Sequence, residues 1–104
     1  MSSPKAPDES MNEARAAITR AEQADGRQYA SDELNESRGK LKMAEEAITR
    51  EEMVEAKQRA NEAEIMAQLA EAKTETAKAT DINQEMQRGA KALTEEMNRG
   101  GEKQ

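Results

Sequence analysis

Pairs of adjacent glutamates are the residues of this chain that come nearest to catalytic or metal-binding groups. They occur at Glu45-Glu46, Glu51-Glu52 and Glu95-Glu96. Two carboxylates held together can perform general acid-base catalysis or bind a divalent cation. Adjacent residues on a helix, however, point about 100° apart, and no calcium-loop pattern or helical Glu-x-x-His pair gathers further ligands around them. We therefore interpret these glutamates as solvated surface charge.

The sequence also lacks the residue types of most other reactive sites. It contains no cysteine and no histidine, so it has no thiol and lacks the commonest proton carrier and metal ligand near neutral pH. Its glycines are isolated, apart from Gly100-Gly101 near the end, and form no loop that would cradle a phosphate. We predict that the protein is not an enzyme and has no catalytic, cofactor or metal site.

Composition restricts the partners of the chain. Of its 104 residues 37% are charged, the net charge is -6, and the mean hydropathy is -1.12. Nucleic acids and anionic lipid surfaces require clustered Lys and Arg, whereas the 16 basic residues here are interspersed with 22 acids. We expect no nucleic-acid partner and, because no run of about 18 apolar residues exists, no transmembrane segment.

Alanine dominates the apolar residues, and there is only one aromatic side chain. Such a set is too small in volume for a thick core but suits thin helices packed side by side, each with one apolar stripe. We predict an all-α, three-helix antiparallel arrangement, in which two short helices pack on the first half of a long C-terminal helix. The helical domain is expected at residues 9–99, with helices at about 10–24, 32–48 and 50–98, a flexible lead at 1–8 and a flexible tail at 100–104.

Capping signals set these expected boundaries. Three N-terminal caps are predicted, at Ser10 with Glu13, at Ser31, and at Thr49 with Glu52. Asp25-Gly26 is expected to end the first helix with the glycine in a left-handed conformation. Tyr29, in the following loop, is the only large ring available to cover a helix junction, and Gly100-Gly101 is expected to end the third helix.

A seam of small residues runs through the middle of the chain. From Met53 to Ala77 they recur at alternating three- and four-residue steps, and Leu34, Leu41 and Ile48 stand seven apart, which is typical of packed helices. The predicted helix-packing seam consists of Leu34, Leu41, Ile48, Met53, Ala56, Ala60, Ala63, Ala67 and Ala70. Either this seam packs the chain's own first two helices, which is the ordinary use of such a stripe, or it receives a helix of another protein.

The C-terminal half of the long helix has an apolar stripe of its own. The first two helices are too short to reach it, so beyond Ala79 it has no partner within the chain. We predict that Ile82, Met86, Leu93 and Met97 form a homodimer interface or bind a partner protein. The chain is accordingly expected to be a structural or protein-interaction module.

Part of the sequence resembles a known family. The residues that carry the resemblance are Ala14-x-x-Ala17-Ile18-x-x-Ala21-x-x-Ala24-Asp25-Gly26, Tyr29-Ala30-Ser31-Asp32-Glu33-Leu34, Lys40-Leu41-x-x-Ala44 and Ala56-x-x-x-Ala60-x-x-Ala63. Residues 11–72 thereby resemble the uncharacterised Ala- and Glu-rich helical domain of Gram-negative envelope lipoproteins, often found ahead of an OmpA-like peptidoglycan-binding domain. The resemblance implies a periplasmic module with an envelope partner. It implies contact with a membrane only if the native precursor carries a lipid anchor, on a cysteine that was removed from this sequence together with the signal peptide. A complete chain would instead be cytoplasmic.

A second hypothesis comes from another class of protein. Residues 70–80, AEAKTETAKAT, are similar to the Ala/Lys/Glu/Thr repeats of late-embryogenesis-abundant proteins. That resemblance implies a stress protein that is disordered alone and becomes helical on binding or drying.

Overall fold

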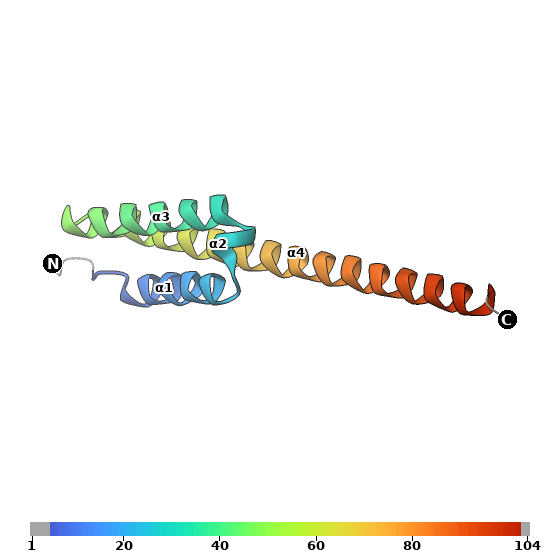
Figure 1. Ribbon diagram of the computed structural model, residues 1–104. Coiled ribbons are helices and arrows are strands. Elements are labelled where there is room, and N and C mark those ends of the chain that lie inside the picture. Colours follow the sequence, from blue (N-terminus) through green and yellow to red (C-terminus); the bar gives the residue numbers. More distant parts are fainter. Residues whose placement is uncertain (1–4, 103–104) are drawn as a thin grey trace.

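Nearly all of the chain that the structure describes, residues 5–102, is helical in the computed structural model (Figure 1). The helices are α1 (Asp8–Gln23), α2 (Gly26–Tyr29), α3 (Ser31–Thr49) and α4 (Met53–Glu102). Within residues 5–102 there is no strand. The prediction of an all-α fold with two short helices on the first half of a long one is confirmed, and α2 is a short additional helix where a loop was expected.

The long helix α4 is the element on which the others pack. Both α1 and α3 contact α4 more extensively than they contact each other. In Figure 1, α3 runs antiparallel to α4, whereas α1 runs parallel to it. The Cα radius of gyration is 22.5 Å, well above the ~13 Å of a compact domain of about 100 residues. The molecule is elongated because the second half of α4 projects alone.

Small side chains form the core between these helices. The largest fully buried side chains are Leu34, Thr74 and Ser37, and the other fully buried core residues are mostly alanines. Alanine ends at Cβ, so two helix backbones can approach closely where it lies between them. The Ser37 hydroxyl shows this approach, since it donates a 2.6 Å hydrogen bond to the backbone carbonyl of Ala63 on α4. The helices of this core are therefore held by close approach of their backbones and not by large apolar side chains.

The predicted caps of the first two main helices are wrong. α1 begins at Asp8 after Pro7, so Ser10 lies inside the first turn and no side chain caps the helix. The N-cap of α3 is Ala30, and Ser31 is the first helical residue. Acidic residues in the first turn of each helix, such as Asp8, favour these starts through the helix dipole.

The turn between α3 and α4 also differs from the predicted capping box. Thr49 still belongs to α3, and its hydroxyl donates to the carbonyl of Glu45 instead of capping α4. Glu51 adopts a left-handed conformation with φ 61°, and the next amide, that of Glu52, donates to the carbonyl of Ala47. This is the Schellman arrangement, which satisfies the last carbonyls of α3 and reverses the chain.

The end of α1 uses a left-handed residue as well, but not the predicted one. Asp25 has φ 79°, whereas Gly26 has no positive φ. Glycine is required at position 26 for a steric reason, because a Cβ there would lie 2.6 Å from the backbone oxygen of Ala21. The glycine thus allows the chain to fold back against the last turn of α1.

Replacing Gly26 should show how much stability depends on its close approach to Ala21. We expect Gly26→Ala to lower the free energy of unfolding by roughly 2 kcal/mol, since backbone atoms must shift to admit the Cβ. Gly39→Ala is the matched control, because a Cβ on Gly39 meets nothing within 4 Å, and it should raise stability by about 0.5–1 kcal/mol. Urea denaturation of both variants measures the difference, and equal stabilities would contradict the close approach at Gly26.

The expected ends of the domain need two further corrections. α4 continues through Gly100 and Gly101 to Glu102, so the predicted stop at these glycines is wrong. The predicted lead at 1–8 includes Asp8, which is helical, and its residues 1–4 lie outside the described part of the chain, as do residues 103–104 of the predicted tail. The observed helix bounds otherwise differ from the predicted ones by a few residues.

Candidate interaction surface

The predicted packing seam lies between α4 and the shorter helices. Its five alanines on α4 are all fully buried, namely Ala56, Ala60, Ala63, Ala67 and Ala70. On α3, Leu34 is fully buried, whereas Leu41 and Ile48 are half-buried, as is Met53 at the start of α4. Ala67 and Ala70 belong to one core cluster with Leu34 and residues of α1. The seam is therefore occupied by the chain's own helices.

Ion pairs hold α3 in register along α4. Lys73 of α4 lies 2.8 Å from Glu33 of α3, and Lys40 of α3 lies 2.8 Å from Glu62 of α4. The hydrogen bond from Lys73 lowers the pKa of Glu33 and raises the pKa of Lys73, and the hydrogen bond from Lys40 lowers the pKa of Glu62. Ion pairs of this kind, in contact with solvent at the edge of the packed helices, contribute little to stability. These ion pairs orient α3 against α4, and nothing in their geometry indicates general acid-base catalysis.

A small cluster of polar contacts marks the point where α4 leaves the packed region. The Tyr29 hydroxyl donates a 3.1 Å hydrogen bond to Asp81, which raises the pKa of Tyr29. Lys78 donates to the carbonyl of Ala24 at 2.9 Å and pairs with Asp25 at 2.8 Å, so it satisfies and neutralises the C-terminal end of α1. Tyr29 thus links α2 to α4 at this point, and it belongs to a short helix instead of the expected loop.

The buried hydroxyl of Thr74 has no hydrogen-bond partner among residues 5–102. It lies in the packed half of α4 and is fully buried. Burying an unpaired hydroxyl costs about 1–3 kcal/mol, so we expect Thr74→Val, which keeps the shape, to raise the free energy of unfolding by about 1 kcal/mol. Thermal and urea denaturation would show the gain, and a loss of stability would mean that the hydroxyl is satisfied in solution. Thr94→Val, on the exposed part of α4, is the control.

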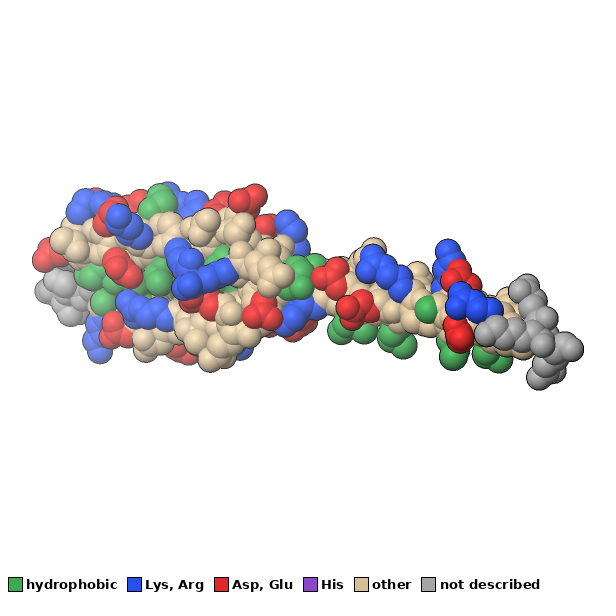
Figure 2. Space-filling model, viewed as in Figure 1, with side chains coloured by type: hydrophobic (Ala, Val, Ile, Leu, Met, Phe, Trp, Pro, Cys, Tyr) green, Lys and Arg blue, Asp and Glu red, His purple; other side chains and the backbone are tan. Residues whose placement is uncertain are grey.

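Beyond Lys78, α4 has no cover. Every residue from 79 to 100 is exposed. Ile82, Met86, Leu93 and Met97, which we call the distal stripe, are between 56% and 68% exposed. Figure 2 shows apolar side chains bulging from one side of the projecting helix. The structure therefore places the four predicted interaction residues on one uncovered surface.

The distal stripe does not simply prolong the alanine seam. Continued at the same three- and four-residue steps beyond Ala77, the seam meets polar residues, namely Asp81, Gln84, Arg88 and Lys91. The apolar residues of the projecting part lie on a different face of α4. Helix α4 consequently offers two separate contact surfaces, the occupied alanine seam and the open distal stripe.

Residues 9–96 match the family described as a domain of unknown function, DUF4398. The chain belongs to this family. The match covers the packed region and nearly all of the projecting part of α4, so the distal stripe lies almost entirely within the family's domain. An uncharacterised helical domain family is what the sequence predicts. Comparison with curated proteins and with solved structures gives no match.

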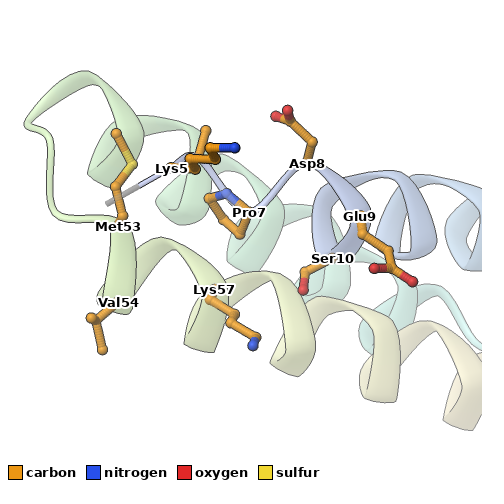
Figure 3. A pocket seen from close by; sticks show the side chains of 9 residues that line it. Lys5, Pro7, Asp8, Glu9, Ser10, Met53, Val54 and Lys57 are labelled. Carbon is orange, nitrogen blue, oxygen red and sulfur yellow. The ribbon is translucent and has the colours of Figure 1, made fainter. Parts of the chain in front are cut away.

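A depression at the open end of this DUF4398 domain lies between the start of α1 and the first turns of α4 (Figure 3). The Asp8 carboxylate and the Val54 side chain point away from each other there, so the lining residues converge on no common point. Among residues 5–100, no three acidic side chains are grouped as metal ligands. None of the helices in the described part of the chain is both long and apolar enough to cross a membrane.

Proposed function

We propose that this protein is a non-enzymatic structural and interaction module. Its packed half holds α4 in place, and the projecting half of α4 binds another helix through the distal stripe. The observation that carries this proposal is the regular stripe of large apolar side chains on a part of α4 that no other described residue covers. An exposed helix without a partner has no use for such a stripe, because polar residues form helix equally well.

The size of the stripe suits a reversible contact. Fully burying a Leu, Ile or Met side chain is worth about 1.5–3 kcal/mol. Because the four side chains already retain only about 56–68% of their exposure, their burial contributes roughly 4–8 kcal/mol from this chain, and a matching partner surface adds a similar amount. Association costs about 4–15 kcal/mol in lost freedom of motion. We therefore expect the contact to form and dissociate with protein concentration.

Site-specific photo-cross-linking in the native cell tests the interaction. A photoreactive amino acid at Met86, on the stripe, should yield covalent adducts, whereas the same group at Lys91, on the polar face, should not. The adduct mass shows whether the partner is a second copy or another protein. Absence of adducts at Met86, with the protein folded and expressed normally, would overturn the proposal.

We also propose that the module acts in the cell envelope, as a periplasmic lipoprotein domain. The support is the resemblance described above, whose most specific part is the segment from Tyr29 to Leu34. Cell fractionation combined with labelling by a clickable fatty acid tests this. We expect the native protein in the envelope fraction and labelled with lipid. An unlabelled protein in the cytoplasm would refute the location but leave the interaction proposal intact.

Circular dichroism in dilute buffer distinguishes the interaction module from the stress-protein alternative. The interaction module should show strong helicity that is lost cooperatively on heating, because the packed half has a tertiary core. A chain that is weakly helical in buffer, and gains helix only on dehydration, would support the alternative instead.

A further inference from the structure

We infer that the distal stripe is covered by a second copy of this chain, lying antiparallel about a two-fold axis near Gly89-Ala90. The inference rests on the proposed function and specifies the partner. Its starting point is that the stripe is symmetric under reversal. Ile82 and Met86 are four positions apart, Leu93 and Met97 are also four apart, and the step from Met86 to Leu93 is seven positions.

This symmetry is what a two-fold contact requires. In an isologous interface the same residues face each other from both copies. With the axis between residues 89 and 90, Ile82 comes opposite the second copy's Met97, and Met86 comes opposite its Leu93. All four large side chains then meet large apolar side chains, each contact occurring twice. A different partner protein would place no such demand on the spacing.

The residues at the axis support close approach of two helices. Gly89 lies inside α4, where glycine destabilises a helix relative to alanine. A Cβ on Gly89 would meet nothing within 4 Å, so no contact within the chain accounts for it. With Ala90 beside it, this glycine lets two backbones approach at the crossing point, as alanines do in the packed half of α4.

The length of the projecting helix also agrees with this arrangement. Asp81 is the residue that Tyr29 of the packed region contacts. In the antiparallel pair, Asp81 comes opposite residue 98 of the second copy, one position beyond Met97. The stretch over which the two stripes meet is about 22 Å long, from residue 82 to 97 at 1.5 Å per residue, and the remaining residues of α4, 98–102, come opposite residues 77–81. The two packed regions lie at opposite ends of this overlap.

Disulfide cross-linking of single cysteines tests the register, because the native chain contains no cysteine. Ala90→Cys places both thiols beside the axis and should form a disulfide dimer under mild oxidation. Ile82→Cys alone and Met97→Cys alone should not, since equal residues are about 22 Å apart, whereas a disulfide needs Cα atoms within about 7 Å. An equimolar mixture of these two variants, one carrying a longer tag, should give the mixed dimer.

Lys91→Cys is the matched control, with its thiol near the axis but on the polar face of α4. We expect Ala90→Cys to cross-link at least tenfold faster than this control, with unchanged helicity in both variants. Efficient self-cross-linking of Ile82→Cys and Met97→Cys would overturn the antiparallel register. Equal rates for Ala90→Cys and Lys91→Cys, with the wild type monomeric by sedimentation at all concentrations, would overturn the second-copy inference.

The experiments distinguish failure of the interaction proposal from failure of the second-copy inference. If the cysteine variants show no dimer but Met86 photo-cross-links to a different protein, the interaction module stands and the second-copy inference falls. If Met86 gives no adduct of either kind, both proposals are refuted.

Discussion

Ala63→Leu is expected to lower the free energy of unfolding by about 3 kcal/mol. Ala63 is fully buried, and Ser37 of α3 donates a 2.6 Å hydrogen bond to its backbone carbonyl. At this close approach there is no room for a leucine side chain, so α3 and α4 must separate along the seam. Overpacking a core costs typically 1–3 kcal/mol, and more where backbones have to move. Urea denaturation followed by circular dichroism measures the loss.

Ala72→Leu is the matched control for this experiment. Ala72 lies on the same helix, within its packed half, but its side chain is exposed. Leucine and alanine have similar helix propensities, so this variant should change stability by less than about 0.5 kcal/mol. If both substitutions had the same small effect, the seam would not be closely packed, and the account of the core would be wrong.

Leu34→Ala should destabilise the protein by a comparable amount, about 3 kcal/mol. Leu34 is the largest fully buried side chain and belongs to the core cluster that joins α1, α3 and α4. Truncating it leaves a cavity among alanines that are too small to fill it, and such Leu-to-Ala changes cost about 2–5 kcal/mol. A thin core has few such side chains, so a single truncation removes a large share of its stability. Denaturant titration provides the measurement.

Leu93→Ala serves as its counterpart on the distal stripe. Leu93 is 63% exposed in the single chain, so in dilute solution its truncation should leave the unfolding of the packed region nearly unchanged. At high protein concentration the same variant should lose the stabilisation that pairing provides. Equal destabilisation by both leucine truncations in dilute solution would contradict the division of α4 into a packed and an open half.

The seam and the distal stripe could be predicted because both rest on spacing. Alanines at three- and four-residue steps, such as Ala60, Ala63 and Ala67, share a face only in a helix. The open second half of α4 followed from length, since helices of the expected size cannot reach beyond Ala79. Both features follow from the ~3.6-residue period of the α-helix and from helix length, and neither depends on a single local interaction.

The boundaries could not be predicted because several local signals compete at each of them. Ser10, Ser31 and Thr49 are all good capping residues by type, yet each lies inside a helix, and the Thr49 hydroxyl donates to the carbonyl of Glu45 instead. Sequence likewise does not reveal whether Asp25 or Gly26 takes the left-handed conformation. That choice depends on the contact of Gly26 with Ala21, which exists only in the folded turn.

Other parts of the structure left no readable signal in the sequence. The helix α2 has four residues, too few for any periodicity to show. The burial of Thr74 without a hydrogen-bond partner depends on which helix covers that turn of α4. By contrast, the polar residues that continue the seam beyond Ala77 are visible in the sequence, and they could have shown that the two stripes lie on different faces.

Amide hydrogen exchange along α4, measured at low and high protein concentration, distinguishes the first half of this helix, packed by its own chain, from the second half, which is uncovered until it pairs. We expect slow exchange for residues 56–74 at both concentrations, and exchange for residues 82–97 that is fast in dilute solution and slower when concentrated. Uniform protection along α4 in dilute solution, or unprotected amides throughout 56–74, would contradict this division of α4.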